Sequence, residues 1–512
     1  MKTEKLKQNV KGYVHQFEDG GLRLLRKGQK GVIHAIFSRF GLVLILLLLQ
    51  VGLLFSIFRW FGNLWPHYFG GSVVVTSAMV IYLLNSKMDN SAKITWMVVV
   101  AIAPVVGIPM FFYVKSNFGH NILRKRLLEL EDQLRGWLPQ SQKAMEQLKV
   151  LEPGAASLAK YLYGRGGGFP VYQNTAMTYF PGGEAKFEEL LRQLETAEEY
   201  IFVEYFIIDE GLMWGKILEV LARKALQGVD VRVMYDGTCE FSTLPRNYPR
   251  LLEKLNIQCK VFSPVQPFVS THYNYRDHRK ILVIDGQVSF TGGVNLADEY
   301  INHIQKHGRW KDAAVMLEGE AVRSLTAQFL QMWGILKEPE YEQFLTRPIP
   351  VPENAKGVAA PYGDCPLDGE RVGEMVYIDL LNRARDYIHI MTPYLILDGE
   401  LDVHLILPGK PDKQFPYALA KSHYSALLDS GVKISEWSPG FVHAKVFVVD
   451  GREAVVGTIN LDYRSLYHHF EDAVWMVDAP CIRDIEQDFQ HTLEQCRTVE
   501  NTSASIWQKH YL

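Results

Sequence analysis

The chain has 512 residues, a formal net charge of −3 and a sequence pI of about 6.6. This length exceeds what one ordinary core supports and predicts roughly two to four domains. The charge balance argues against a protein that binds nucleic acid through an overall basic field, so an anionic partner must be held by local charges.

The chain contains five cysteines, which are scattered without CxxC spacing, and an odd number cannot all pair within one chain. We therefore expect neither a disulfide framework nor a cysteine-bound zinc ion, but reduced cysteines that serve mainly in packing. Such usage fits a catalytic part that faces the cytoplasm. These residues are Cys239, Cys259, Cys365, Cys481 and Cys496.

The apolar content of the chain is concentrated in its N-terminal part. A basic segment at 1–39 precedes residues 40–58, which carry no charge and are long enough to cross the hydrocarbon core of a membrane. No cleavage site of the signal-peptidase type follows this stretch. We predict a transmembrane helix here and a transmembrane region over 40–115.

Two further apolar stretches, 69–84 and 94–114, bring the expected number of spans to two or three. The second of these is interrupted by two prolines and a glycine, which is typical of a kinked or re-entrant span. Basic residues before position 40 and the sequence LRKR at 123–126 both favour the cytoplasmic side. Three full spans cannot satisfy both signals. We expect a multi-pass protein of the cell membrane with its catalytic lobes in the cytoplasm.

Residues 116–165 are charged and carry leucines at helical spacing, which predicts an amphipathic connector. Beyond it, strand and helix patterns alternate, as in α/β architecture. Residues 200–209 and 229–237 are predicted to be strands on either side of a helix. The stretches 387–398 and 402–409 resemble these two strands, so the lobe is repeated.

The predicted fold is therefore α/β, with two pseudo-symmetric lobes at 166–345 and 346–512 after the transmembrane region. The second copy has a defect, because the chain passes from Asp398 to Asp402 with no room for the helix that the first copy has. A parallel crossover needs about a dozen residues or more. Either the second copy connects these strands differently or one strand has left its sheet position.

One eight-residue pattern occurs twice, as HRKILVID at 278–285 and HAKVFVVD at 443–450. On a strand, His278 and Lys280 project to the same face, as do His443 and Lys445. An imidazole beside an ammonium suits a phosphate group. One imidazole attacks phosphorus while neutral and the other, protonated, expels the leaving alkoxide, so two copies supply both roles.

Other residues agree between the copies. Seventeen positions after each histidine an asparagine follows a glycine-containing turn, and further on a carboxylate opens a strand. We assign the asparagines and the carboxylates together to the substrate-binding residues. Within this set, we expect the carboxylates to fix the tautomers of the histidines. The aspartates that end the two motifs are grouped with the catalytic set in an orienting or structural role. These pairs are Asn295 and Asn460, Asp312 and Glu471, and Asp285 and Asp450.

The remaining histidines carry no comparable pattern. His272, His303, His307, His468 and His469 are interpreted as surface or supporting residues, and His404 as an isolated strand residue. The sequence has no HExxH, no GxxxxGK[ST] and no glycine-rich dinucleotide fingerprint. We therefore expect neither a metal ion nor a cofactor.

The paired motifs, with TGGVN and VGTIN after them, resemble the two HxKxxxxD signatures of the phospholipase D superfamily. The stretch AKITWMVVVAIAPVVGIPMFFY resembles the membrane segment of bacterial cardiolipin synthases, and VEYFIIDEG, MTPYLILD and GVKISEWSPGFVHAK add to the likeness. The resemblance covers about residues 70–512.

The resemblance implies transfer of a phosphatidyl group from one phosphatidylglycerol to another, with release of glycerol. It implies His278 as the nucleophile that forms a phosphohistidine and His443 as the acid and then the base. Lys280, Lys445 and the two asparagines would hold the phosphoryl oxygens in place of a metal. The expected partners are phosphatidylglycerol and membrane lipids, with no nucleic acid, and the oligomeric state stays open.

Three other functions are compatible with parts of the pattern. A hydrolytic phospholipase D, or a transferase using another alcohol, would share the same intermediate. A nuclease of the superfamily is disfavoured by the charge balance and the apolar segments. A non-catalytic membrane scaffold is disfavoured by the two complete motifs.

Overall fold

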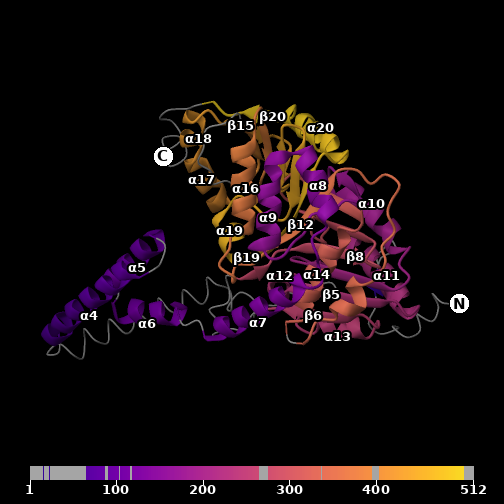
Figure 1. Ribbon diagram of the computed structural model, residues 1–512. Coiled ribbons are helices and arrows are strands. Elements are labelled where there is room, and N and C mark those ends of the chain that lie inside the picture. The colour runs from indigo at the N-terminus through magenta and orange to yellow at the C-terminus, as the bar shows by residue number, and fades with distance from the viewer. Residues whose placement is uncertain are drawn as a thin grey trace. The chain divides into compact units, whose positions relative to one another are not determined.

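The computed structural model describes residues 15–16, 22–23, 65–86, 90–102, 104–115, 118–263, 275–335, 337–394 and 403–500. The chain divides into two compact units (Figure 1). The larger consists of Met1–Arg26, Leu123–Gln266 and His272–Leu512. The smaller consists of Lys27–Ile122 and Pro267–Thr271.

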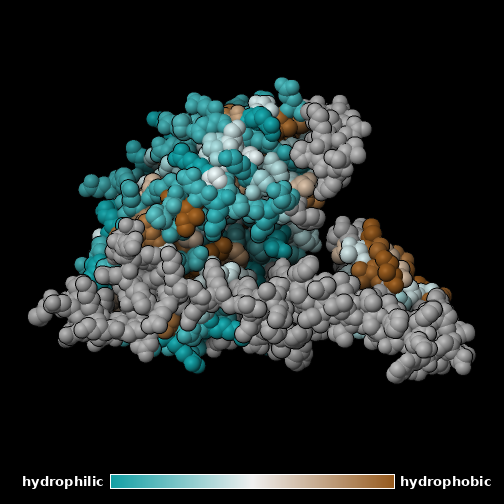
Figure 2. All heavy atoms as spheres, turned by 180° about the vertical axis from the view of Figure 1, so that it is seen from behind, coloured by the Kyte–Doolittle hydropathy of each residue, from teal (hydrophilic) through white to brown (hydrophobic). Residues whose placement is uncertain are grey.

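Among its described residues, the smaller unit contains α4 (Trp65–Asn85), α5 (Asn90–Ile102), α6 (Pro104–Lys115) and the first residues of α7 (Phe118–Arg135). Met79, Leu83, Val100 and Phe111 form its small core. Its helices also expose large apolar side chains, such as Val74 at 69% and Ile102 at 79%. Figure 2 shows such residues in brown on the outside of these helices. Exposed apolar surface of this kind favours contact with lipid or another apolar surface.

The helices fall short of the spans that the sequence predicts. Within the ranges described above, no helix combines the length and the apolar character needed to cross a membrane. The stretch 69–84 lies in α4, whereas 94–114 is divided, because α5 ends at Ile102 and α6 begins at Pro104, whose ring cannot continue a helical hydrogen-bond ladder. The stretch 40–58 lies outside the described residues. The expected two or three spans are thus not supported by the structure.

The larger unit contains two large mixed sheets, one from each copy of the repeat. The first has the order β3-β11-β9-β8-β4-β5-β6 and the second the order β12-β19-β18-β17-β13-β14-β15-β20. Seven strands correspond one to one, and β4–β5 and β13–β14 are parallel pairs in both. The predicted α/β repeat is therefore present.

The strands of the first sheet are β3 (Thr175–Phe180), β4 (Tyr200–Tyr205), β5 (Asp230–Asp236), β6 (Gln258–Phe262), β8 (Lys280–Ile284), β9 (Val288–Gly292) and β11 (Ala314–Gly319). Those of the second are β12 (Val358–Asp364), β13 (Ile388–Met391), β14 (Val403–Pro408), β15 (Lys433–Trp437), β17 (Val446–Val449), β18 (Glu453–Gly457), β19 (His469–Val477) and β20 (Cys496–Thr498). A separate two-stranded pair joins β1 (His15–Gln16) and β2 (Leu22–Arg23).

Helices cover the sheets and fill the space between them. Around the first sheet lie α10 (Gly183–Leu194), α11 (Leu212–Leu226), α12 (Cys239–Ser242) and α13 (Tyr248–Glu253). Around the second lie α8 (Gln142–Leu151), η2 (Pro153–Ala155), α9 (Ala156–Gly164), α16 (Val372–Arg383), α17 (Gln414–Ser422), α18 (Tyr424–Asp429) and α19 (Tyr463–His468). The core that the two lobes share includes residues of α14 (Val322–Trp333), α15 (Tyr341–Leu345), α20 (Cys481–Leu493) and α7 (Phe118–Arg135).

The apolar stripes of the sequence account for these positions. In α11, Trp214, Ile217, Leu218 and Leu221 recur at helical spacing and are fully buried against the first sheet. The predicted connector at 116–165 contains α7, α8 and α9, and the leucines of α7 at 127, 130 and 134 are buried as a stripe.

The second copy keeps its strand despite the shortened crossover. β14 lies parallel to β13, in the place that β5 holds beside β4. In the first copy α11 makes this connection, whereas in the second residues 392–402 make it, and 395–402 lie outside the described residues. The sequence leaves open whether the strand loses its position in the sheet or is connected differently. The structure supports the second alternative, because β14 keeps its position.

Candidate active site

Two short parallel strand pairs carry each motif histidine to the opposite copy of the repeat. β7 (Arg276–Asp277) pairs with the first residues of β19, and the N–H of His278 then donates to the carbonyl of Phe470 at 2.9 Å. In the same way β16 (Gly440–Val442) pairs with β10 (Arg309–Lys311), and the N–H of His443 donates to the carbonyl of Lys311 at 2.7 Å. The backbone thereby sets the position of both imidazoles.

Each imidazole meets a carboxylate that the opposite copy supplies. Nδ1 of His278 lies 2.8 Å from Oε2 of Glu471, and Nδ1 of His443 lies 2.8 Å from Oδ2 of Asp312. Both carboxylates are fully buried. A carboxylate only accepts, so we assign the ring proton to Nδ1 in both histidines, which leaves Nε2 with a free electron pair.

Burial and charge set the protonation of these groups. Burial lowers the pKa of His278 well below its usual value, and burial followed by Lys445 lowers the pKa of His443 to about 4. Burial acts to raise the pKa of Asp312, but His443 and Lys445 outweigh it and bring the value to about 2. Glu471 is likewise held below its ordinary pKa, because the neighbouring imidazoles outweigh burial. Both carboxylates are therefore charged and both imidazoles neutral at pH 7.

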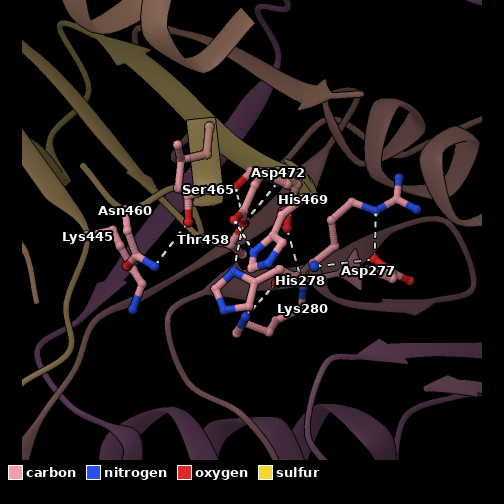
Figure 3. Close-up of polar contacts among 12 residues, drawn as sticks. Asp277, His278, Lys280, Lys445, Thr458, Asn460, Ser465, His469 and Asp472 are labelled. Atoms are coloured by element: carbon pink, nitrogen blue, oxygen red, sulfur yellow. Dashed lines mark hydrogen bonds and ion pairs between the residues drawn. The ribbon is translucent and has the colours of Figure 1, made fainter. Parts of the chain in front are cut away.

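The two motif lysines lie next to their histidines and are buried. Each ammonium donates to the backbone carbonyl of the histidine two positions before it, and Nζ of Lys445 also lies 2.9 Å from Nδ1 of His443. Burial lowers the pKa of Lys280 to about 8 and that of Lys445 to about 7, and the charge of Lys280 contributes to the shift of Lys445. The two motifs thus share one site, where Figure 3 shows Lys445 and Lys280 on either side of His278.

The two asparagines are held by their own lobes. Oδ1 of Asn295 accepts from the N–H of Ile207 at 3.1 Å, and its Nδ2 donates to the hydroxyl of Tyr300 at 2.7 Å. Nδ2 of Asn460 donates to Oγ of Ser465 at 3.1 Å. Both asparagines are buried in the conformation described.

The aspartates that end the motifs are not brought to the histidines. Asp285 accepts hydrogen bonds from three consecutive backbone N–H groups, those of residues 198–200. Asp450 does the same with residues 385–387. Both adopt positive φ angles of 51° at the end of a strand. Their geometry is that of turn-stabilising residues, in line with the orienting or structural role expected for them.

Several residues around the imidazoles were not assigned to the site from the sequence. Thr458 donates to Glu471, and its counterpart Gly293 lies against Asp312, where a Cβ atom would come within 1.9 Å of Oδ1. Asp472 accepts from the hydroxyl of Thr291, and burial raises its pKa to about 6. The repeated signals TGGVN and VGTIN contain three of these positions, Thr291, Gly293 and Thr458, but they do not reveal the contacts.

Two ring residues, Trp310 and His469, also border the histidines. His469, interpreted from the sequence as a surface or supporting residue, is only 7% exposed and lies beside His278. His303 is exposed, and His272 lies outside the described residues.

One cluster of the described residues, His278, His469 and Glu471, brings three nitrogen and oxygen atoms within 4.8 Å of one another. The hydrogen bond between His278 and Glu471 occupies two of these atoms, and Lys280 adds a positive charge beside them. We therefore interpret the cluster as a hydrogen-bonded network and not as a metal centre.

This arrangement suits transfer of a phosphoryl-type group. Two imidazoles with free Nε2 atoms provide a nucleophile and a proton carrier. Two buried lysines provide positive charge where negative charge would develop on phosphoryl oxygens.

Comparison with known proteins agrees with this chemistry. The family model described as "Cardiolipin synthase, PLD-like domain" matches residues 190–333 and 377–493, which contain both motifs. A protein of Streptococcus mutans serotype c, described as an uncharacterized protein, is 54% identical over 437 residues, which is 83% of this chain and 94% of that protein.

Several relatives, including the following two, are named after an activity. A cardiolipin synthase of Geobacillus sp. (strain WCH70) is 33% identical over 450 residues, covering 83% of this chain and 87% of the relative. Cardiolipin synthase 2 of Bacillus anthracis is 33% identical over 437 residues, covering 81% of this chain and 83% of the relative.

Proposed function

We propose a specific phosphatidyl transfer for this chain, which belongs to the cardiolipin synthase family of phospholipase D-like enzymes. Members of this family are phosphatidyltransferases. The proposed reaction joins two phosphatidylglycerol molecules to give cardiolipin and free glycerol.

In the first step, Nε2 of His278 attacks the phosphorus of one phosphatidylglycerol. The bond from phosphorus to the glycerol headgroup breaks, and His443 gives its Nε2 proton to the departing oxygen. This leaves glycerol and a phosphatidyl group on His278. Neutral His278 is suited to attack, because Glu471 stabilises the positive charge that builds on its ring.

In the second step, His443 accepts the proton of a headgroup hydroxyl on a second phosphatidylglycerol. That oxygen attacks phosphorus, the bond to Nε2 of His278 breaks, and cardiolipin forms. His443 regains its proton for the next cycle. The anionic phosphodiester favours this protonation when bound, because a neighbouring negative charge raises the pKa that burial has lowered.

The observation that supports this proposal most is the pair of crossed contacts between imidazole and carboxylate. Each holds Nδ1 at 2.8 Å from a carboxylate and leaves Nε2 for chemistry. In this proposal, Lys280 and Lys445 hold the phosphoryl oxygens. Asn295 and Asn460 donate to the same oxygens once their present hydrogen bonds to Tyr300 and Ser465 have rearranged.

The lipid substrates require contact with a membrane. The exposed apolar side chains of α4, α5 and α6 and the uncharged stretch 40–58 favour such contact. We propose that the chain is anchored in the cell membrane with its lobes on the cytoplasmic side.

The test uses the full-length protein in vesicles of phosphatidylglycerol, with the products followed by thin-layer chromatography and mass spectrometry. We expect cardiolipin and glycerol in equal amounts, and loss of turnover by at least about a thousandfold in His278→Ala. His491→Asn, on the exposed side of α20, is the matched control and should behave as wild type. Phosphatidic acid without cardiolipin would show hydrolysis and overturn the proposal.

The order of the two roles is tested by trapping. In His443→Ala we use a phosphatidyl ester of p-nitrophenol, whose leaving group needs no acid, so His278 can still react while the second step lacks its base. A labelled phosphatidyl group should then remain on His278. Peptide mapping after a short reaction identifies the labelled residue. Label on His443 in the converse His278→Ala variant would reverse the assignment.

A further inference from the structure

Trp310 and His469 occupy matching places in the two copies of the repeat. The indole of Trp310 lies 5.3 Å from the ring of His443 at an interplanar angle of 43°. The imidazole of His469 lies 5.2 Å from the ring of His278 at 40°. Figure 3 shows this second pair side by side. The two motif histidines thus have the same kind of neighbour in the same place.

Each of these neighbours also places a ring nitrogen near the carboxylate two positions further along the chain. Nε1 of Trp310 donates to Oδ2 of Asp312 at 3.3 Å. Nδ1 of His469 lies 3.4 Å from Oε1 of Glu471, and both atoms are buried without a hydrogen-bond partner in the described part of the chain. A small rotation of the imidazole would join them, and catalytic hydrogen bonds are often poorly aligned before substrate binds.

The two carboxylates differ in whether their second oxygen accepts a hydrogen bond. Oδ1 of Asp312 accepts from the N–H of Ala313 at 2.9 Å. In Glu471, Oε2 receives the bonds of His278 and Thr458, whereas Oε1 has no hydrogen-bond partner in the described part of the chain. Glu471 is fully buried, and leaving a buried carboxylate oxygen without a donor is costly. His469 is the group in position to supply that donor.

Resting on the proposed function, we propose that His469 is a positioning residue for His278: it holds Glu471 by its second oxygen and thereby fixes the carboxylate that orients His278. At His443 the indole of Trp310 serves the equivalent carboxylate.

The surroundings of His469 are polar. It faces His278 and Glu471, Asp462 before α19, and His468 next to it on the chain. A donor at Nδ1 of His469 would satisfy Oε1 of Glu471 and keep this carboxylate in place beside His278, where its charge stabilises the imidazole as a nucleophile.

Two substitutions separate the donor from the ring. His469→Asn keeps an N–H donor near Oε1, and His469→Phe keeps a ring of similar size without a donor. We expect His469→Phe to lower kcat by about ten- to a hundredfold and His469→Asn to lower it less, because the amide supplies the donor. Trp310→Phe, which removes the equivalent donor beside His443, is the matched control.

The comparison of the two variants carries the part of the test that a purely structural role would not alter. If His469 only filled space, the phenyl ring would replace it at least as well as the smaller asparagine. Equal kcat in the Asn and Phe variants, or a higher kcat in the Phe variant, would overturn the proposal.

A second readout needs no lipid and therefore separates this inference from the proposed function. Diethyl pyrocarbonate modifies neutral imidazoles, and peptide mass spectrometry gives its rate at His278 and His443 in one sample. At pH 7, His469→Phe should lower the rate at His278 relative to that at His443, and His469→Asn should restore the wild-type ratio in part. Trp310→Phe should change the ratio in the opposite direction. An unchanged ratio in His469→Phe overturns the role of His469 whatever the lipid assay shows, and absent cardiolipin with a changed ratio overturns only the proposed function.

Discussion

Glu471 reaches His278 across the boundary between the two copies of the repeat, with Oε2 placed 2.8 Å from Nδ1. Asp312 reaches His443 in the opposite direction at the same distance. The β7–β19 and β10–β16 strand pairs hold these contacts in register. Neither copy alone supplies a motif histidine together with the carboxylate that it contacts, so the site exists only where the two copies meet.

The first prediction concerns these carboxylates. Glu471→Gln and Asp312→Asn should each lower kcat by at least about a hundredfold, because an amide can donate to Nδ1 and stabilise the wrong tautomer. Glu486→Gln is the control, since Glu486 forms a similar 2.9 Å contact with His389 away from the site. Cardiolipin formation measures the effect, and circular dichroism shows whether each variant folds. Near wild-type kcat in both site variants would contradict the assigned tautomers.

The second prediction concerns Gly293. A Cβ atom there would come within 1.9 Å of Oδ1 of Asp312, so Gly293→Ala should push this carboxylate away from His443. We expect kcat to fall by about tenfold or more, with the larger effect on the step that His443 serves. Gly164→Ala is the control, because nothing lies within 4 Å of its added Cβ. Wild-type turnover in Gly293→Ala would show that Asp312 does not need its present position.

Much of the site could be predicted from the sequence because its signals are local. The two motifs, the asparagines at fixed spacing and the alternating strands identify the repeat, and the matching strand orders confirm it. The crossing of the carboxylates could not be predicted. It depends on strand pairs of two and three residues between segments far apart in the chain, which are too short to leave a periodic pattern.

Letter-by-letter alignment is also misleading at this place. KDA at 311–313 and EDA at 471–473 align Asp312 with Asp472, but the sheet register pairs Gly292 with Ala314 and Gly457 with Ala473. By this register, Asp312 is equivalent to Glu471, and Trp310 is equivalent to His469. An alignment that is shifted by one residue assigns a side chain to the wrong face of a strand, so the matching letters KDA and EDA indicate the wrong counterpart.

The third prediction concerns pH. Lys280 and Lys445 have pKa values of about 8 and about 7 because they are buried, so both lose their charge as the pH rises through this range. We expect kcat/KM, which reports the free enzyme, to fall on the basic side from about pH 7 to 8. Lys280→Arg keeps its charge at high pH and should move this fall upward, although its larger side chain lowers the maximum.

Lys125→Arg provides the control for this profile, because Lys125 is 81% exposed on α7 and far from the motifs in sequence. Its profile should overlay that of wild type. If the fall of kcat/KM at basic pH occurred at the same pH in Lys280→Arg and Lys445→Arg as in wild type, the ionisation would belong to another group.

The fourth prediction separates stability from catalysis at Asp285 and Asp450. Each carboxylate accepts three backbone hydrogen bonds and lies outside the contacts of the imidazoles. Asparagine tolerates their positive φ of 51° but has one acceptor oxygen and no charge. Each Asp→Asn change should therefore lower the free energy of unfolding by about 1–3 kcal/mol, measured by urea denaturation, while kcat per folded molecule stays within about twofold. Asp132→Asn, on the exposed face of α7, should alter neither quantity. A large loss of kcat with unchanged stability would return these aspartates to the catalytic set, where the motif alone had placed them.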